Sequence, residues 1–147
     1  MTPGQGGAAQ RPTQDLSGDA LVVRVVRPGE VTEVEGADGI VRLRPKSSEF
    51  AATLGANEGM SVFLVDDLPD EFDAADILTC GLFEEGSTLW ISTLSVYRDE
   101  GLQIVRDDIP ELPGHGLLRK PDGGRFNSGL RTRLAKRAKQ WEPRDPQ

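Results

Sequence analysis

Short β-branched segments separated by turn residues dominate the first third of this chain. Residues 21–27 read Leu-Val-Val-Arg-Val-Val-Arg and run into Pro28-Gly29, and two similar segments follow at residues 31–34 and 40–44. Runs of this kind bounded by Gly, Pro or Asp are typical of strands and their turns. We therefore expect three strands that open the fold as a β-meander.

The rest of the body alternates between strand and helix patterns. Residues 60–66 are largely apolar on both sides of the predicted strand, which is typical of a strand in the centre of a sheet. Further strands are expected at residues 87–91, 102–106 and 115–119, and short helices at residues 47–55 and 68–81. Residues 92–100 could extend the strand before them or form a helix ended by Gly101, and we favour the helix.

The last part of the chain has apolar positions at helical spacing. Asn127 or Ser128 can cap a helix that runs to Gln140. An apolar stripe follows this helix, formed by Leu130, Leu134, Ala138 and Trp141. Arg and Lys occupy most of the other positions. The whole pattern predicts an α+β fold with a mixed or mostly antiparallel sheet, short helices and a C-terminal amphipathic helix.

Composition divides the chain into three segments. Residues 1–18 contain almost no large apolar side chains and are expected to be disordered. Residues 19–120 form the predicted acidic α+β domain, and residues 121–147 a basic linker and helix. The net charge is −7, but residues 1–118 hold 8 Lys and Arg against 21 Asp and Glu, whereas residues 119–147 hold 9 against 3. This asymmetry predicts an interaction tail, or a tail that folds back on its own acidic body.

Targeting and redox features favour the cytoplasm. Cys80 is the one cysteine, so no internal disulfide can form. Residues 1–18 have neither the basic nor the apolar region of a signal peptide, and no apolar run approaches the roughly 20 residues of a membrane span. We expect a cytoplasmic protein without a membrane span. The abundance of Arg over Lys is typical of a GC-rich, bacterial genome.

Sequence motifs for common reactions are absent. The chain has no phosphate loop, no dinucleotide-binding glycine fingerprint and no nucleophile elbow. One Cys and one His cannot form a zinc site of the usual Cys/His kind within one chain. The acidic residues between positions 66 and 73 lack the spacing of a calcium loop. The sequence predicts neither a metal nor a cofactor.

His115 is the one histidine and the one candidate for a general base. It lies in Pro113-Gly114-His115-Gly116, where the flanking glycines would let a ligand approach closely. The alternative is a histidine at the start of a strand that bonds a loop carbonyl. No serine stands out from its local sequence as the matching nucleophile.

A basic island interrupts the acidic body. Arg42 and Arg44 share one face of a predicted strand, and Lys46 and Ser47 lead into a helix N-terminus, which is a natural environment for an anion. We expect these four residues to converge with His115 on a pocket for a phosphorylated or nucleotide ligand. The alternative is exposed strand residues followed by a helix cap.

One enzyme class fits by architecture alone. Toxins of the ADP-ribosyltransferase type are small split-sheet α+β domains with an arginine on an early strand and a serine on a later one, and Arg42 and Ser61 have corresponding positions. No matching catalytic glutamate motif accompanies them; Glu84-Glu85 is the nearest substitute.

The sequence favours an accessory or regulatory protein over an enzyme. We expect it to bind a protein partner through its acidic surface and its basic helix. The predicted contact residues are Asp66, Asp67, Asp70, Glu71, Arg131, Arg133, Arg137 and Trp141. The alternative is a small enzyme or ligand-binding domain that uses the basic island and His115. Binding of nucleic acid through the tail is less favoured, because the acidic body repels phosphates and no recognition motif is present.

Overall fold

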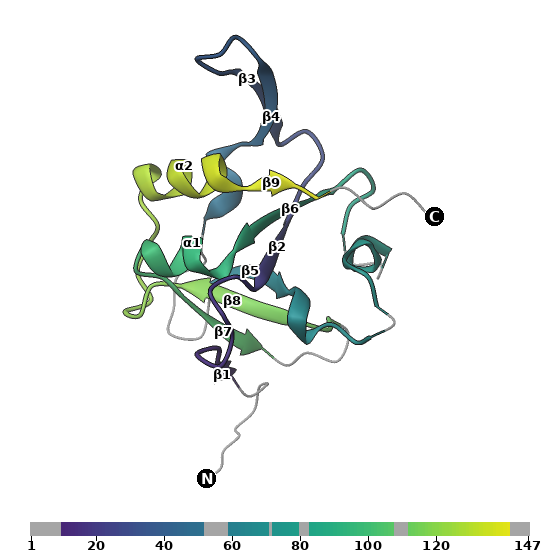
Figure 1. Ribbon diagram of the computed structural model, residues 1–147, viewed down its shortest axis with the longest axis vertical. Helices are drawn as coiled ribbons and strands as arrows, with labels where there is room; N and C mark the ends of the chain where they lie inside the picture. The colour runs from purple at the N-terminus through teal and green to yellow at the C-terminus, as the bar shows by residue number, and fades with distance from the viewer. Residues whose placement is uncertain (1–9, 52–58, 71, 80–82, 108–111, 142–147) are drawn as a thin grey trace.

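The computed structural model describes residues 10–51, 59–70, 72–79, 83–107 and 112–141 (Figure 1). Its main sheet has seven strands, which are all paired in antiparallel fashion. In spatial order they are β1 (Gln10–Pro12), β7 (Gln103–Asp107), β8 (His115–Arg119), β5 (Met60–Leu64), β2 (Leu21–Val26), β6 (Thr88–Thr93) and β9 (Lys139–Gln140). With two α-helices, this is the predicted α+β class with a mostly antiparallel sheet.

The remaining elements are short. In the described ranges, the α-helices are α1 (Leu94–Asp99) and α2 (Ser128–Arg137), and the 3-10 turns are η1 (Ser47–Phe50), η2 (Val65–Asp67) and η3 (Ala74–Thr79). A separate two-stranded hairpin consists of β3 (Val31–Glu35) and β4 (Val41–Pro45). Among the residues described, no helix has the length and apolar character that a membrane crossing requires.

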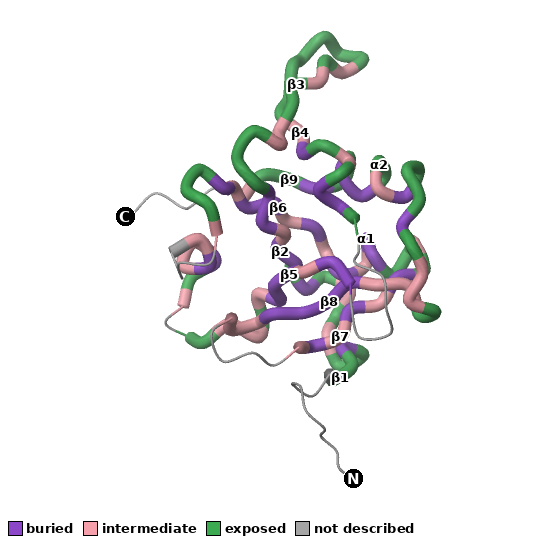
Figure 2. The backbone as a smooth tube through the Cα atoms, turned by 180° about the vertical axis from the view of Figure 1, so that it is seen from behind, coloured by how far each residue is buried: buried purple, intermediate pink, exposed green. Residues whose placement is uncertain are grey.

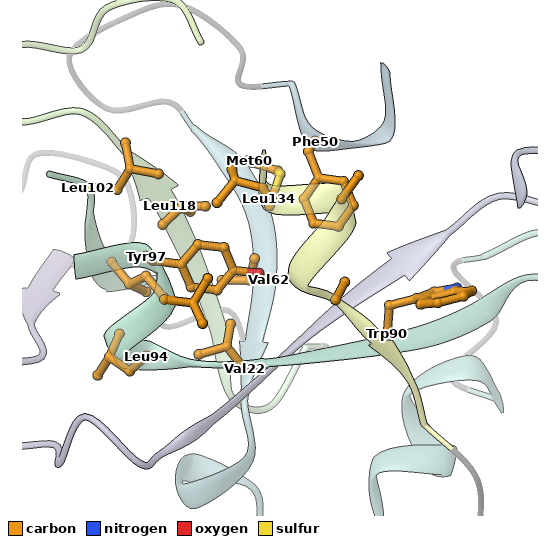
Figure 3. Packing of buried hydrophobic residues seen from close by; sticks show 14 of the residues in the cluster. Val22, Phe50, Met60, Val62, Trp90, Leu94, Tyr97, Leu102, Leu118 and Leu134 are labelled. Atoms are coloured by element: carbon orange, nitrogen blue, oxygen red, sulfur yellow. The ribbon is translucent and has the colours of Figure 1, made fainter. Parts of the chain in front are cut away.

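Strand β5 lies between β8 and β2, which confirms the prediction of a central strand. Alternation along β5 sends Val62 and Leu64 to one face of the sheet and Phe63 to the other. The first face carries the larger core, in which Phe50 of η1, Tyr97 of α1 and Leu134 of α2 are buried (Figure 3). Each large apolar side chain buried in this way contributes roughly 1.5–3 kcal/mol.

The opposite face of the sheet carries a smaller apolar cluster. Phe63 and residues of β2 and β6 contact Ala74 and Ile77 of η3 there. Phe83 packs edge-on against Phe63, with 6.0 Å between the ring centroids. The helix predicted at residues 68–81 is therefore only a 3-10 turn over Ala74–Thr79 in the described part of the chain, where it covers this cluster.

The β3–β4 hairpin does not belong to the main sheet, so the predicted opening meander is wrong. Strand β2 pairs with β5 and β6 instead, and within the described part of the chain β3 and β4 pair only with each other. The hairpin projects from the body with its tip exposed (Figures 1 and 2). Its aliphatic side chains Ile40, Val41 and Leu43 are 52–55% exposed.

The base of this hairpin is closed by an ion pair. Glu49 of η1 is buried and accepts hydrogen bonds from the Arg27 backbone N–H at 3.0 Å and from the Arg27 guanidinium at 2.7 Å. Burial by itself would raise the pKa of Glu49, but the hydrogen bonds from Arg27 outweigh it and lower that pKa. The Lys46 N–H also donates to the Glu30 carbonyl at 2.9 Å. These contacts fix the position from which the hairpin projects.

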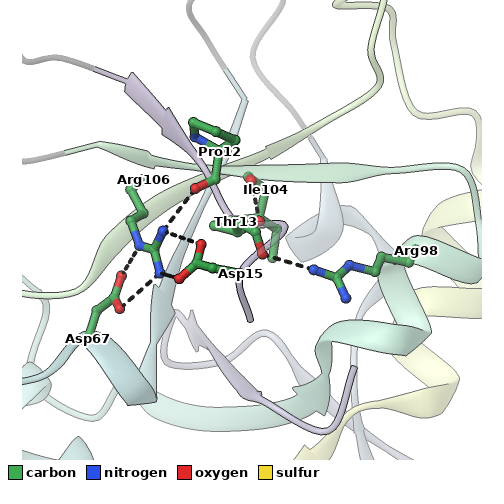
Figure 4. Close-up of polar contacts among 7 residues, drawn as sticks. All are labelled: Pro12, Thr13, Asp15, Asp67, Arg98, Ile104 and Arg106. Carbon is green, nitrogen blue, oxygen red and sulfur yellow. Dashed lines mark hydrogen bonds and ion pairs between the residues drawn. The ribbon is translucent and has the colours of Figure 1, made fainter. Parts of the chain in front are cut away.

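Residues 10–18 depart from the expected disorder. Gln10–Pro12 forms β1 beside β7, and Arg106 of β7 donates to Asp15, to the Pro12 carbonyl and to Asp67 (Figure 4). The Thr13 hydroxyl also donates to the Ile104 carbonyl at 2.7 Å. Polar bonds to a buried arginine order a segment that has too few apolar side chains to be ordered by burial.

Helix α2 is shorter than predicted. Asn127 caps it as expected, since its side chain accepts from the Leu130 N–H at 2.8 Å. The helix ends at Arg137, because Ala138 is extended and the next two residues pair with the edge of β6 as β9. Leu130, Leu134 and Ala135 are buried in the larger core, so this segment folds back on the body rather than standing apart from it.

Candidate functional site

A groove of about 670 Å³ separates the β3–β4 hairpin from the end of α2 and from β9. The hairpin register pairs Thr32 with Arg44 and Val34 with Arg42, so these side chains share one face. Val34 and both arginines line the groove. Its other wall is formed by Trp90, Lys136, Ala138, Lys139 and Gln140.

Four cationic side chains surround this groove, namely Arg42, Arg44, Lys136 and Lys139. Arg42 is neutralised by Asp38, with 2.8 Å between nitrogen and oxygen. Within the described ranges, Arg44, Lys136 and Lys139 have no ion-pair partner. Such a grouping of like charges creates a positive potential that an anionic group would relieve.

Two further grooves continue from this one, the first along β9 and the second beside Trp141, which follows β9. One of about 660 Å³ shares Lys136, Lys139 and Gln140 with the first groove and also contains Leu21, Ile91, Arg137 and Trp141. Another of about 380 Å³ shares Leu21, Ile91 and Trp141 and ends at Asp66, Asp70 and Asp73. An apolar strip therefore lies between a basic end and an acidic end.

We call this continuous area the β9 surface. Its basic end is formed by Arg42, Arg44, Lys136, Arg137 and Lys139. Its apolar strip is Leu21, Ile91 and Trp141, and its acidic end is Asp66, Asp70 and Asp73. Among the residues that the structure describes, β9 is the last strand of the sheet and pairs only with β6, so its outer edge has backbone groups that another extended segment can pair with.

The structure brings half of the predicted partner-binding residues onto the β9 surface: Asp66, Asp70, Arg137 and Trp141. The others are placed differently. Asp67 accepts from Arg106 at 2.6 Å, and Arg133 bonds Glu100 at 3.0 Å. Arg131 is half-buried, and Glu71 lies outside the described residues.

The predicted anion-binding group is only partly assembled. Arg44, Lys46 and Ser47 line one small pocket together with Thr132 and Ala135 of α2. Ser47 does not cap η1, because Lys46 occupies the capping position and no side chain bonds there. Arg42 lines the neighbouring groove instead. His115 lines neither of these two pockets, and its side chain bonds Asp107 and Ser61 instead.

His115 belongs to a different group of residues on the sheet. It is buried at the start of β8, with Nδ1 3.1 Å from Asp107 Oδ2 and Nε2 3.1 Å from Ser61 Oγ. The strand register pairs Phe63 with His115 and Ser61 with Leu117, which places these four side chains on one face. We call Ser61, His115 and Asp107 the His115 cluster.

The chemistry of the His115 cluster assigns the hydrogen bonds. An ionised Asp107 can only accept, so His115 Nδ1–H donates to it and Nε2 is left to accept from the Ser61 hydroxyl. Burial lowers the pKa of His115 below the 6.5 of a free histidine, although Asp107 acts in the opposite direction. Neutral imidazole is therefore the favoured form at neutral pH.

This depressed pKa predicts how stability depends on pH. In the unfolded chain His115 binds a proton near pH 6.5, whereas in the folded chain it binds the proton only at a lower pH. The contribution of neutral His115 to the free energy of unfolding is complete above pH 6.5. It is lost as the pH falls from there towards the lower pKa that His115 has in the folded state. We expect urea unfolding to show this loss in the wild type and a smaller one in His115→Gln, which has no group to titrate. Equal losses in both proteins would contradict the prediction.

The sequence could suggest His115 but not its partners. Ser61 and Asp107 are separated from it by 54 and 8 positions, and only the register of β5, β7 and β8 brings them together.

The glycines that flank His115 have a structural reason: a side chain at Gly114 would meet Leu68 and the Leu64 carbonyl, and one at Gly116 would meet Ile104. They accommodate neighbouring residues rather than a ligand.

The architectural analogy with ADP-ribosyltransferases gains no support from the contacts. Arg42 lies on the separate hairpin and bonds Asp38, whereas Ser61 lies on β5 and bonds His115.

Among the described residues, no three His, Cys, Asp or Glu side chains are grouped closely enough to hold a metal ion.

Comparison with known proteins identifies no relative: no family model, no curated protein and no solved structure matches the chain. The function must therefore be inferred from the geometry of the side chains.

Proposed function

We propose that this protein is a small accessory or regulatory protein of the cytoplasm that binds an extended segment of a protein partner on the β9 surface. The observation that supports this proposal is the continuity of three grooves, two lined by β9 and the third by the Trp141 that follows it, with an apolar strip between a basic and an acidic end. Apolar contacts supply affinity in such an interface, and the flanking charges supply orientation and a fast association rate.

The edge position of β9 suggests the form of the partner. An extended segment can pair with the outer edge of this strand while its alternate side chains enter the grooves on either side. Acidic side chains would then contact Lys136 and Lys139, and an apolar side chain would contact Trp141. Helix α2 supports this role as an amphipathic helix, since it buries Leu130 and Leu134 and leaves Lys136 and Arg137 exposed.

A protein segment suits this surface better than nucleic acid does. Asp66, Asp70 and Asp73 at one end would repel a phosphate backbone. Trp90 is 2% exposed and does not offer a ring for base stacking. The projecting hairpin adds aliphatic rather than aromatic exposed side chains, which is more typical of a protein contact.

Selection from a displayed library of random peptides tests the proposal, because such a library samples segments of any sequence. We expect the full chain to enrich peptides in which Asp or Glu flanks an apolar residue. The matched control is a selection against the protein carrying Trp141→Ala and Lys139→Glu, which should not enrich these peptides. If the wild type enriches nothing, or if both proteins enrich the same peptides, the β9 surface is not the binding site.

A further inference from the structure

The His115 cluster has the connectivity of a nucleophile, a general base and an orienting carboxylate. Ser61 Oγ is 3.1 Å from Nε2 of His115, and Nδ1 of the same ring is 3.1 Å from Asp107. Both distances are within hydrogen-bond reach, which is the geometric requirement for passing the serine proton to the ring. All three residues lie on adjacent strands of the main sheet, so they are held by backbone pairing rather than by a loop.

His115 is the most shielded of the three residues, and Ser61 is not fully buried. Ser61 is half-buried, so solvent reaches this residue. The His115 side chain is 6% exposed and that of Asp107 is 16% exposed. The base and the carboxylate are thus largely shielded from water, and the nucleophile is not fully buried.

We propose that Ser61 is an activated nucleophile that accepts acyl groups from small, uncharged carboxylic esters, with His115 as its base and Asp107 as the residue that orients His115. The substrate class follows from the neighbours on the same sheet face. Leu117 is paired with Ser61, Val105 is paired with Leu117, and Phe63 is paired with His115. These side chains favour an apolar acyl group, and Asp107 disfavours an anionic one.

The reaction balances with water as the second substrate. Ser61 Oγ attacks the ester carbonyl carbon while its proton moves to His115 Nε2, and the carbonyl carbon releases the alcohol oxygen, which takes that proton. The acyl group is then an ester of Ser61. Water attacks the same carbon, gives a proton to Nε2, and the bond from carbon to Oγ breaks as Oγ recovers the proton. The products are one alcohol and one carboxylic acid.

Labelling with a fluorophosphonate, followed by mass spectrometry of the intact chain and its peptides, tests the proposal directly. We expect one adduct on the wild type, located at Ser61, and turnover of p-nitrophenyl acetate. Ser61→Ala should abolish the adduct, and Asp107→Asn should slow labelling by roughly 100-fold or more, in line with the contribution of an oriented general base. Ser48→Ala, which changes an exposed serine on η1, should label like the wild type.

A second measurement needs no substitution that risks the fold. Because His115 is the one histidine, its ring nitrogens give an isolated set of NMR signals. The proposal requires a neutral ring with the proton on Nδ1 at neutral pH. The absence of an adduct on the wild type, an adduct that persists in Ser61→Ala, or a proton on Nε2 would each overturn it.

Discussion

Reversing two charges at the basic end of the β9 surface is expected to weaken binding of the selected peptides about 100-fold. Lys136→Glu with Lys139→Glu replaces attraction of an acidic segment by repulsion at two exposed positions of the groove. At roughly 1–1.5 kcal/mol for each changed interaction, the loss in binding free energy is about 2–3 kcal/mol. Fluorescence of Trp141, which lies on the same surface, can follow the titration.

The control for this prediction is a second pair of reversals with the same change in net charge. Lys120 and Arg125 line none of the grooves of the β9 surface, so Lys120→Glu with Arg125→Glu should leave the affinity within about threefold of the wild type. Binding to the wild type should also weaken as salt is added. Equal losses in the two double variants would mean that net charge, rather than this surface, determines binding.

Replacing Arg106 with Met is expected to destabilise the protein by about 3 kcal/mol. The Arg106 side chain is only 10% exposed and bonds Asp15 at 2.8 Å and Asp67 at 2.6 Å. Removing the cation leaves both carboxylates without their partner, and loss of one member of a largely buried pair costs about 3–5 kcal/mol. The lower value applies because Asp15 is 65% exposed and can be hydrated again.

Urea unfolding measures this loss, and hydrogen exchange locates it. Amides of the N-terminal segment such as that of Leu16, which donates to the Thr13 carbonyl, should exchange faster in Arg106→Met. Arg125→Met, at an exposed arginine, should change the free energy of unfolding by no more than about 0.5 kcal/mol. Arg106→Met with wild-type stability would show that the segment is ordered without this network.

Elements whose signals are local were predictable from the sequence. β8 has the predicted limits, and α1 agrees with the helix expected at residues 92–100. Asn127 caps α2 as its position suggested. In each case the residues that determine the element lie within the element or next to it, so distant contacts do not enter the prediction.

Elements that depend on distant partners were not predictable. Nothing in residues 31–45 reveals that β2 pairs with β5 and β6 and therefore excludes the hairpin. The N-terminal segment is ordered by Arg106, which is 91 positions from Asp15. β9 forms because an edge of β6 is open to it, although the sequence there continues a helical pattern.

The residues of the candidate sites also divide into those that local sequence could predict and those that depend on distant contacts. Residue type and charge were enough to single out Arg137, Trp141 and His115 without their surroundings. Three other features depend on strand register. They are the groove wall that lies opposite the hairpin, the apolar strip at Leu21 and Ile91, and the contact between His115 and Ser61. A change of register by one residue would send each of these side chains to the other face of its strand.

Mapping amide chemical shifts during titration with a selected peptide tests the central claim most directly. The β9 surface predicts the largest shifts at Lys136–Trp141, with further shifts at Arg44 on one side and at Asp66 or Asp70 on the other. Shifts confined to the tip of the hairpin, or grouped around Ser61 and His115 on β5 and β8, would contradict it.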